Sequence, residues 1–118
     1  MLINKTKEEV IVAKVKIAKK LWERLKGLMF ENVGSFNYAL ILELPKETKK
    51  GAAIHSMFVF FPFDVVWLDS KRRVVDKKSN IKPFTATPIV PKKKAKYIVE
   101  LPAGKAKSIR AGDLLEWK

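Results

Sequence analysis

The chain has 118 residues, of which 25 are Lys or Arg and 12 are Asp or Glu, so its formal net charge is +13. This length suits one domain over residues 1–118, and the 47% share of hydrophobic residues is typical of a folded globular chain. The absence of Cys excludes disulfides, thiolate metal sites and a Cys nucleophile, and the single His55 excludes a metal site built from several His. We therefore expect no metal and no cofactor.

Neither a targeting segment nor a membrane helix is expected. Residues 1–14 carry Glu8 and Glu9 where a signal peptide would need an apolar core. The longest apolar run, residues 57–68, is interrupted by Asp64 and is shorter than the roughly 20 residues that span a bilayer. We expect a soluble, cytoplasmic protein. Its lack of Gln and Cys and its many Lys are a tendency of hyperthermophilic proteins.

The first half of the chain predicts a strand, a helix and a second strand. Apolar β-branched residues alternate with other residues over 8–18, which is typical of a strand. The period then becomes helical over 19–26, and four apolar residues are expected on one helix face: Leu21, Leu25, Leu28 and Met29. A strand is predicted at 38–44, ended by Pro45, with a polar loop over 45–51.

The second half predicts mostly strands. These are expected at 52–61, 64–69, 73–78, 96–101 and 113–117. The strand 64–69 is apolar on both faces, which indicates a central position in its sheet. The connections are a hairpin turn at 70–72, a Pro-rich extended loop at 82–94, and a loop with a helical turn at 102–112. The fold class is therefore mainly β: a compact antiparallel, barrel-like or rolled sandwich with one short amphipathic helix.

Four motifs stand in order along most of the chain: RLKGLMF (24–30), IHSMFVFFPFDVVWLD (54–69), RRVVDKKSNIKPF (72–84) and YIVELPAGKAKSIRAGDLLEW (97–117). Together they resemble the uncharacterised family called domain of unknown function 192, in an archaeal form. The resemblance implies a compact, mostly β single domain without an established activity. Two positions depart from the family pattern, because Val59 stands where a Met is expected and Phe60 where a basic or polar residue is usual.

His55 is the first candidate for chemistry, because only a His side chain titrates near neutral pH in its ordinary state. It could act as an acid, a base or a switch, or it could be a structural residue of its strand. Ser56 follows it directly, and neighbours on a strand point to opposite faces. The two side chains are therefore not expected to pair as base and nucleophile.

Asp64 and Asp69 are five residues apart on one predicted strand, so they should face opposite sides. Asp64 shares its face with apolar residues and needs a partner there, such as Arg24, Lys82 or backbone N–H groups near Pro62. It could instead be a pocket acid. Asp69 opens the hairpin turn, where Asp is favoured for local hydrogen bonds.

Arg24 lies on the predicted helix and could clamp a carboxylate, either from this chain or from a ligand. Gly27, Gly104 and Gly112 are expected to serve backbone geometry, since no phosphate-binding glycine motif is present. Glu100 and Asp113 could join Asp64 in a site for a hard cation, although nothing in their spacing requires one.

The basic segment, residues 71–96, holds ten basic residues and one acid, which gives +9 of the total +13. Such a field attracts polyanions such as nucleic acids, or it is a solvated lysine face. The candidates for nucleic-acid contact are Lys71, Arg72, Arg73, Lys92, Lys93 and Lys94. The Phe side chains of the second motif are not interleaved with these charges, so we expect Phe58, Phe60, Phe61 and Phe63 to lie in the core.

The leading functional hypothesis is a non-catalytic binding or accessory module. The family resemblance implies that its motifs meet at a ligand site formed by Arg24, His55, Asp64 and Lys82. One alternative is electrostatic binding of nucleic acid through the basic segment. Another is an enzyme of unknown reaction that uses His55 as its acid or base.

Overall fold

The computed structural model describes residues 1–118, except for the side chains of Leu21 and Trp22. The strands form a five-stranded sheet of order β3-β4-β7-β5-β6 and a three-stranded sheet of order β2-β1-β8. The first sheet consists of β3 (Lys14–Ala18), β4 (Tyr38–Thr48), β5 (Phe63–Leu68), β6 (Val74–Ile81) and β7 (Ala95–Pro102). The second consists of β1 (Leu2–Asn4), β2 (Glu9–Val12) and β8 (Leu115–Trp117). Both sheets are open, so the sandwich alternative of the predicted fold class is confirmed and the barrel is not formed.

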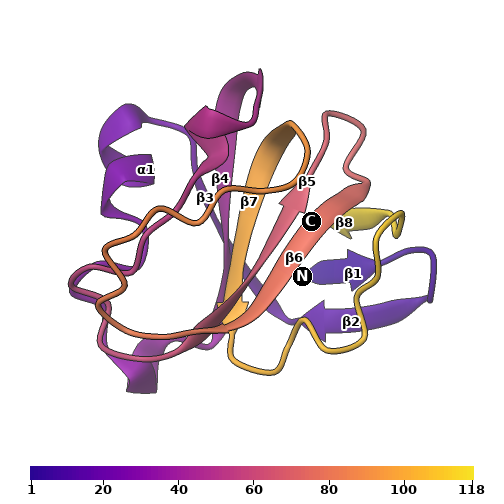
Figure 1. The fold of residues 1–118 in the computed structure, drawn as a ribbon. Helices are drawn as coiled ribbons and strands as arrows, with labels where there is room; N and C mark the ends of the chain where they lie inside the picture. The colour runs from indigo at the N-terminus through magenta and orange to yellow at the C-terminus, as the bar shows by residue number, and fades with distance from the viewer.

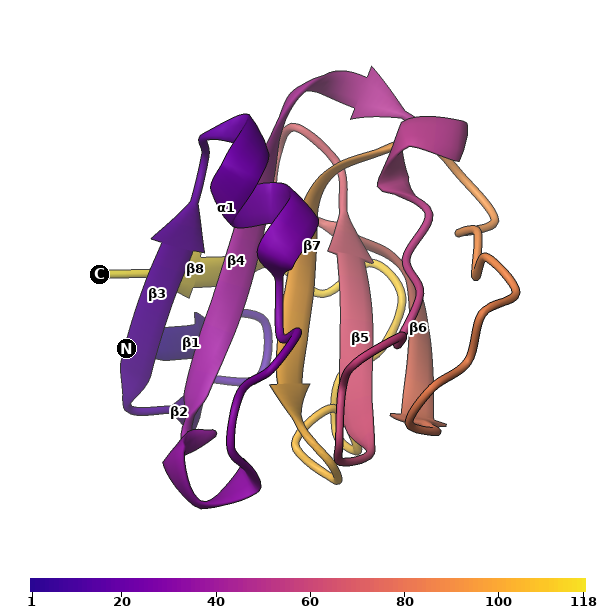
Figure 2. The same cartoon turned by 90° about the vertical axis from the view of Figure 1, so that its left-hand side faces the viewer.

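Apolar side chains cover both faces of the five-stranded sheet. The three-stranded sheet packs on one face, around Leu2, Val66 and Leu101. On the other face lie the helix α1 (Leu21–Lys26) and the loops before β5 and after β6, around Phe63 and Ile98. Figures 1 and 2 show these two coverings on opposite sides of the sheet. Because side chains alternate along a strand, consecutive residues of β5 and β7 enter different cores.

The central strand is confirmed at β5, where all six residues are buried. It pairs with β7 on one side and with β6 on the other, both antiparallel. The turn between β5 and β6 is also confirmed, since the Asp69 carboxylate accepts hydrogen bonds from the N–H groups of Lys71 at 2.9 Å and Arg73 at 3.0 Å. The strand pairing in the sheet is antiparallel apart from β3 and β4, which are parallel.

The predicted strand 8–18 is wrong as a single element. It divides into β2 and β3, which lie in different sheets, and β2 pairs with β1, a strand that the sequence did not predict. Pro45 does not end β4, which continues to Thr48. The pairing of β4 with β7 is interrupted between Glu43 and Thr48, so Pro45 occupies a stretch where its missing N–H breaks no ladder hydrogen bond.

The predicted strand 52–61 is also wrong. After a short 3₁₀ turn, η2 (Lys50–Ala52), only one isolated bridge joins Ile54 to Ile89 of the Pro-rich loop. Ser56 holds this irregular segment, because its N–H donates to the carbonyl of Thr85 at 3.0 Å and its carbonyl accepts from the N–H of Phe84 at 2.8 Å. This segment is therefore a loop that is hydrogen-bonded to the Pro-rich loop, and it is not a strand.

The predicted helix is confirmed as α1, which the polar turn η1 (Val33–Ser35) follows after a short connection. The apolar face of α1 is only partly as predicted. Leu28 is buried and Met29 half-buried just beyond the helix, whereas Leu25 is exposed to solvent. The expected contribution of Leu21 lies outside the described residues. No helix in the described part of the chain is long and apolar enough to cross a bilayer.

Candidate functional site

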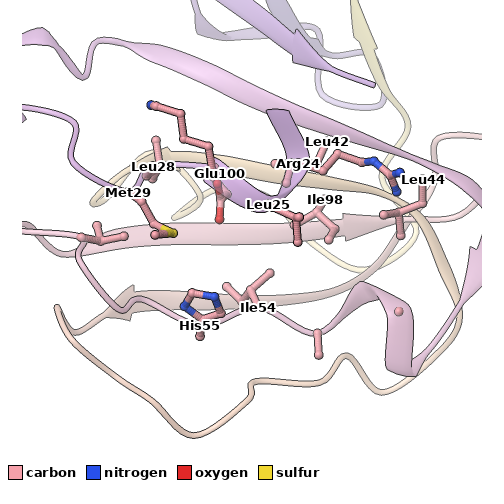
Figure 3. A pocket seen from close by; sticks show the side chains of 15 residues that line it. Arg24, Leu25, Leu28, Met29, Leu42, Leu44, Ile54, His55, Ile98 and Glu100 are labelled. Atoms are coloured by element: carbon pink, nitrogen blue, oxygen red, sulfur yellow. The ribbon is translucent and has the colours of Figure 1, made fainter. Parts of the chain in front are cut away.

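A cavity of about 260 Å³ lies between α1 and the five-stranded sheet. Its walls come from the helix and the turn after it, from β4 and β7, and from the loop 51–59. Leu42, Leu44 and Ile98 supply an apolar floor, and Arg24, His55 and Glu100 supply polar groups (Figure 3). Ligand cavities are typically apolar with a few converging polar groups, and drug-sized ligands occupy about 300–1,000 Å³. This cavity therefore fits a smaller molecule.

Glu100 is the most unusual residue of the cavity. It shares its sheet face with Ile98, and its side chain is 5% exposed. Its Oε1 has no hydrogen-bond partner among the described residues. Burial raises the pKa of the Glu100 carboxyl to about 8, so near neutral pH the group is mostly protonated and can both donate and accept a hydrogen bond.

The turn after α1 passes close to this carboxyl. Gly27 has φ +48°, and a Cβ added there would stand 3.4 Å from Oε1 of Glu100. A glycine is thus favoured both by the left-handed backbone and by the close approach to the carboxyl. The helix end is thus part of the surroundings that bury Glu100, and this burial raises the pKa of the carboxyl.

Arg24 reaches the same cavity from α1. Its Nε is buried without a hydrogen-bond partner, and no ion pair involves its guanidinium among the described residues. In Figure 3 the guanidinium lies beside Leu44, at the other side of the view from the carboxyl of Glu100. Among the described residues, Arg24 therefore does not clamp a carboxylate of this chain. The cavity has unpartnered polar atoms at both ends.

His55 is exposed at the rim of the cavity, and its Nδ1 accepts a hydrogen bond from the N–H of Met57 at 3.2 Å. This bond leaves Nε2 as the ring atom free to donate. Ser56 points inward, and its hydroxyl donates to the carbonyl of Lys82 and accepts from the N–H of Thr85. The two side chains are apart, as expected, although the cause is a folded loop and not a strand.

The structure brings together two of the four predicted ligand residues, Arg24 and His55. Asp64 lies on the opposite face of the sheet, where its carboxylate accepts from the N–H groups of Asn80 at 2.8 Å, Gly104 at 2.9 Å and Ala106 at 3.0 Å. These bonds give it backbone partners, although not the ones near Pro62 that the sequence indicated. Lys82 is exposed on the loop after β6 and is not among the residues that line the cavity.

The candidate hard-cation residues do not meet. Glu100 and Asp64 lie on opposite faces of the sheet, and the Asp113 carboxylate accepts from the side-chain amide of Asn4 at 2.8 Å and from the N–H of Arg110 at 2.9 Å. No group of three metal-binding side chains is found within the described residues. The sequence had named Glu100 only for this cation site, although its position on the face of Ile98 was the signal for a buried acid.

Part of the basic segment lies at the end of the sheet where β5 ends and where β6 and β7 begin. Lys71, Arg73, Lys92, Lys93 and Lys94 are exposed there or on the adjoining loop. Two of the candidates make contacts within the chain. Arg72 stacks on the ring of Trp117 at 3.8 Å, and Arg73 donates to the carbonyl of Gly112 at 3.2 Å.

Two of the four Phe side chains expected in the core are in solvent. Phe61 and Phe63 are buried, whereas Phe58 and Phe60 are exposed. Burial alternates along residues 58–63, with Val59, Phe61 and Phe63 inside, so Phe58 and Phe60 fall on the solvent side. Phe58 also has a positive φ of 59°.

Comparison with known proteins gives the family. The family described as "DUF192: Uncharacterized ACR" matches residues 2–117. A UPF0127 protein of Thermococcus kodakarensis is 44% identical over 99% of this chain and 73% of its own length. One from Pyrococcus abyssi is 40% identical over 99% of this chain and 97% of its own length. These relatives come from archaeal thermophiles, in agreement with the tendency in the composition.

Two solved structures share the fold. A Novosphingobium aromaticivorans protein of unknown function has a TM-score of 0.76 at 24% identity, over 87% of this chain and 74% of its own. A Sinorhizobium meliloti protein, whose name proposes a role as a transcription regulator, has a TM-score of 0.79 at 21% identity. The match covers 86% of this chain and 79% of that protein. At these identities the likeness concerns the fold alone. The match over residues 2–117 shows that the chain belongs to the uncharacterised family DUF192, also called UPF0127.

Proposed function

We propose that this chain is a small-molecule-binding domain whose site is the cavity under α1. The observation that carries the proposal is the buried Glu100 carboxyl, which faces the cavity without a hydrogen-bond partner in the described part of the chain. Buried polar groups in native proteins almost always have partners, and an unpartnered one costs about 1–3 kcal/mol. A bound molecule that supplies the missing partner would recover this energy.

The polar groups of the cavity define the class of ligand. Glu100 at one end offers a hydrogen-bonding carboxyl, which a bound ammonium group would convert to its anionic form, and Arg24 at the other end offers a cationic donor. Between them Leu42 and Ile98 present apolar surface. The fitting ligand is a small molecule with a short apolar body, an amine for Glu100 and a carboxylate for Arg24.

Binding fits this geometry better than catalysis by His55. The imidazole lies at the open rim, where its Nε2 could donate to a ligand. The neighbouring hydroxyl of Ser56 is buried and already bonded to Lys82 and Thr85, so it is not free to act as a nucleophile. We therefore assign His55 a role in contacting the ligand.

The experiment is thermal unfolding of the protein with three probes of one chain length: butylamine, butyrate and γ-aminobutyrate. A ligand that binds only the folded state raises Tm, and the probe with both end groups should raise it most. Glu100→Gln should remove the effect of the amine, and Arg24→Leu that of the carboxylate.

Glu43→Gln is the matched control, because Glu43 is on the opposite face of the same sheet in an ion pair with Lys19 at 3.7 Å. It should respond to the probes as the wild type does. If no probe shifts the wild-type Tm, this ligand class is wrong. If the shift survives in Glu100→Gln, the cavity is not where the probe binds.

A further inference from the structure

Four exposed Phe side chains form a patch next to the cavity, which we call the aromatic patch: Phe30, Phe58, Phe60 and Phe84. They are between 44% and 64% exposed. The rings of Phe30 and Phe58 stack with centroids 5.2 Å apart. Phe84 makes edge contacts with Phe60 at 5.2 Å and with Phe58 at 6.2 Å. The four rings are therefore one continuous apolar surface and not scattered side chains, and such patches mark interaction sites.

Three different loops carry the aromatic patch, and backbone hydrogen bonds lock them together. The N–H of Phe30 donates to the carbonyl of Phe58 at 2.9 Å, and the N–H of Phe84 donates to the carbonyl of Ser56 at 2.8 Å. Figure 1 shows the loops before β5 and after β6 running side by side at the lower left. The patch is thus a fixed feature of the fold.

The backbone under the patch is strained. Phe30, Phe58 and Phe84 have φ values of 64°, 59° and 57°, in the left-handed region. A bulky residue is a real outlier there, and such residues persist only where the surrounding structure holds them. Three strained Phe residues within one exposed cluster indicate that the patch serves contact with an apolar partner.

The positive charge of the chain favours an anionic surface over a second copy of the chain as the partner. The loop residues 54–63 and 80–84, which carry three of the four rings, contain no Asp or Glu and include Lys82. The acid in the third loop, Glu31, is paired with Lys26 at 3.3 Å. Two copies of a chain of net charge +13 repel each other, whereas an anionic surface attracts it.

We propose that the aromatic patch docks on an anionic lipid surface, with the Phe rings inserted among the lipids, Lys82 near the head groups, and the net charge of +13 attracting the chain to the surface. Exposed apolar rings beside basic side chains are the usual means of such interfacial binding. Base stacking by nucleic acid is less favoured, because the rings of Phe30 and Phe58 already stack on each other. This inference does not depend on the proposed function of the cavity.

The test is co-sedimentation of the full chain with vesicles of phosphatidylcholine, with and without phosphatidylglycerol. The wild type should bind the anionic vesicles and be weakened, but not fully released, by salt. Phe58→Ser/Phe60→Ser should lower the partition coefficient by about tenfold or more. The matched control is Val10→Ser/Ile17→Ser, which removes two exposed apolar side chains outside the patch and should bind as the wild type does.

A second variant, Phe60→Trp, keeps the test independent of folding defects in the Ser variant. Its emission should shift to the blue with anionic vesicles, relative to the wild type measured in parallel. The proposal is overturned if the wild type ignores anionic vesicles, or if the Ser variant binds them unchanged. It is also overturned if the patch is instead needed for dimerisation in gel filtration or for binding of single-stranded RNA.

Discussion

The carboxylate of Asp64 accepts a hydrogen bond from the N–H of Gly104 at 2.9 Å and so joins the central strand to a loop forty positions later in the chain. The same carboxylate also bonds the N–H groups of Asn80 and Ala106. This acid in a nearly apolar strand therefore connects β5 to Asn80 of β6 and to the loop after β7. This arrangement explains how a carboxylate with 1% exposure is tolerated beside Val65 and Val66.

Replacing Asp64 should therefore destabilise the fold strongly. Asp64→Ala leaves three backbone N–H groups without their acceptor, and we expect a loss of about 3–5 kcal/mol in the free energy of unfolding. Asp64→Asn keeps one acceptor oxygen and should lose less. Urea denaturation measures both, with Asp69→Asn in the exposed turn as the control. Near-wild-type stability of Asp64→Ala would contradict the structural role.

The Glu100 carboxyl should make stability depend on pH. Its pKa is about 8 in the folded chain against an ordinary value of 4.5, so the folded state holds more protons than the unfolded state between these values. Stability must then fall as pH rises from about 4.5 to about 8, by roughly 1.4 kcal/mol per pKa unit of difference.

Glu100→Gln removes this titration. The variant should gain stability relative to the wild type as pH rises through this window, by a few kcal/mol at its upper end. Urea unfolding at a series of pH values measures the difference. Parallel pH profiles for Glu100→Gln and the wild type would show that the carboxyl is not buried as described.

Ser56→Ala should loosen the two loops that Ser56 connects. The hydroxyl is fully buried and accepts from the N–H of Thr85 at 2.7 Å while donating to the carbonyl of Lys82. We expect a loss of about 1–3 kcal/mol and faster hydrogen exchange at Phe84 and Thr85. Ser79→Ala, on the exposed part of β6, is the matched control. Unchanged exchange would mean that the backbone bonds alone hold the loops.

Arg72→Ala should lower stability by about 1 kcal/mol, because the guanidinium lies over the rings of Trp117 and Tyr97. The backbone strain at φ 66° is unchanged, since Ala also carries a Cβ. Lys71→Ala in the same exposed turn should stay within about 0.5 kcal/mol of the wild type. Equal effects of the two substitutions in thermal unfolding would show that the stacking contributes nothing.

The elements that the sequence predicts correctly are those with local physical causes. The continuous apolar run of β5 requires burial on both faces, and the helical period after residue 18 requires an amphipathic helix. Asp69 bonds within its own turn, so its role follows from neighbours alone. The errors at 8–18 and 52–61 share one cause, because a strand-like sequence pattern does not say which sheet a segment joins or whether it joins one.

The family, the mainly β class, the buried strand at 64–69 and the net charge follow from the amino-acid sequence. The placement of Asp64 and Glu100 on opposite faces of one sheet, and the exposure of Phe58 and Phe60, follow from the folded arrangement. Side-chain burial and hydrogen-bond partners depend on segments that are distant in the chain. The loops that meet at Ser56 and the turn that covers Glu100 become neighbours only after folding.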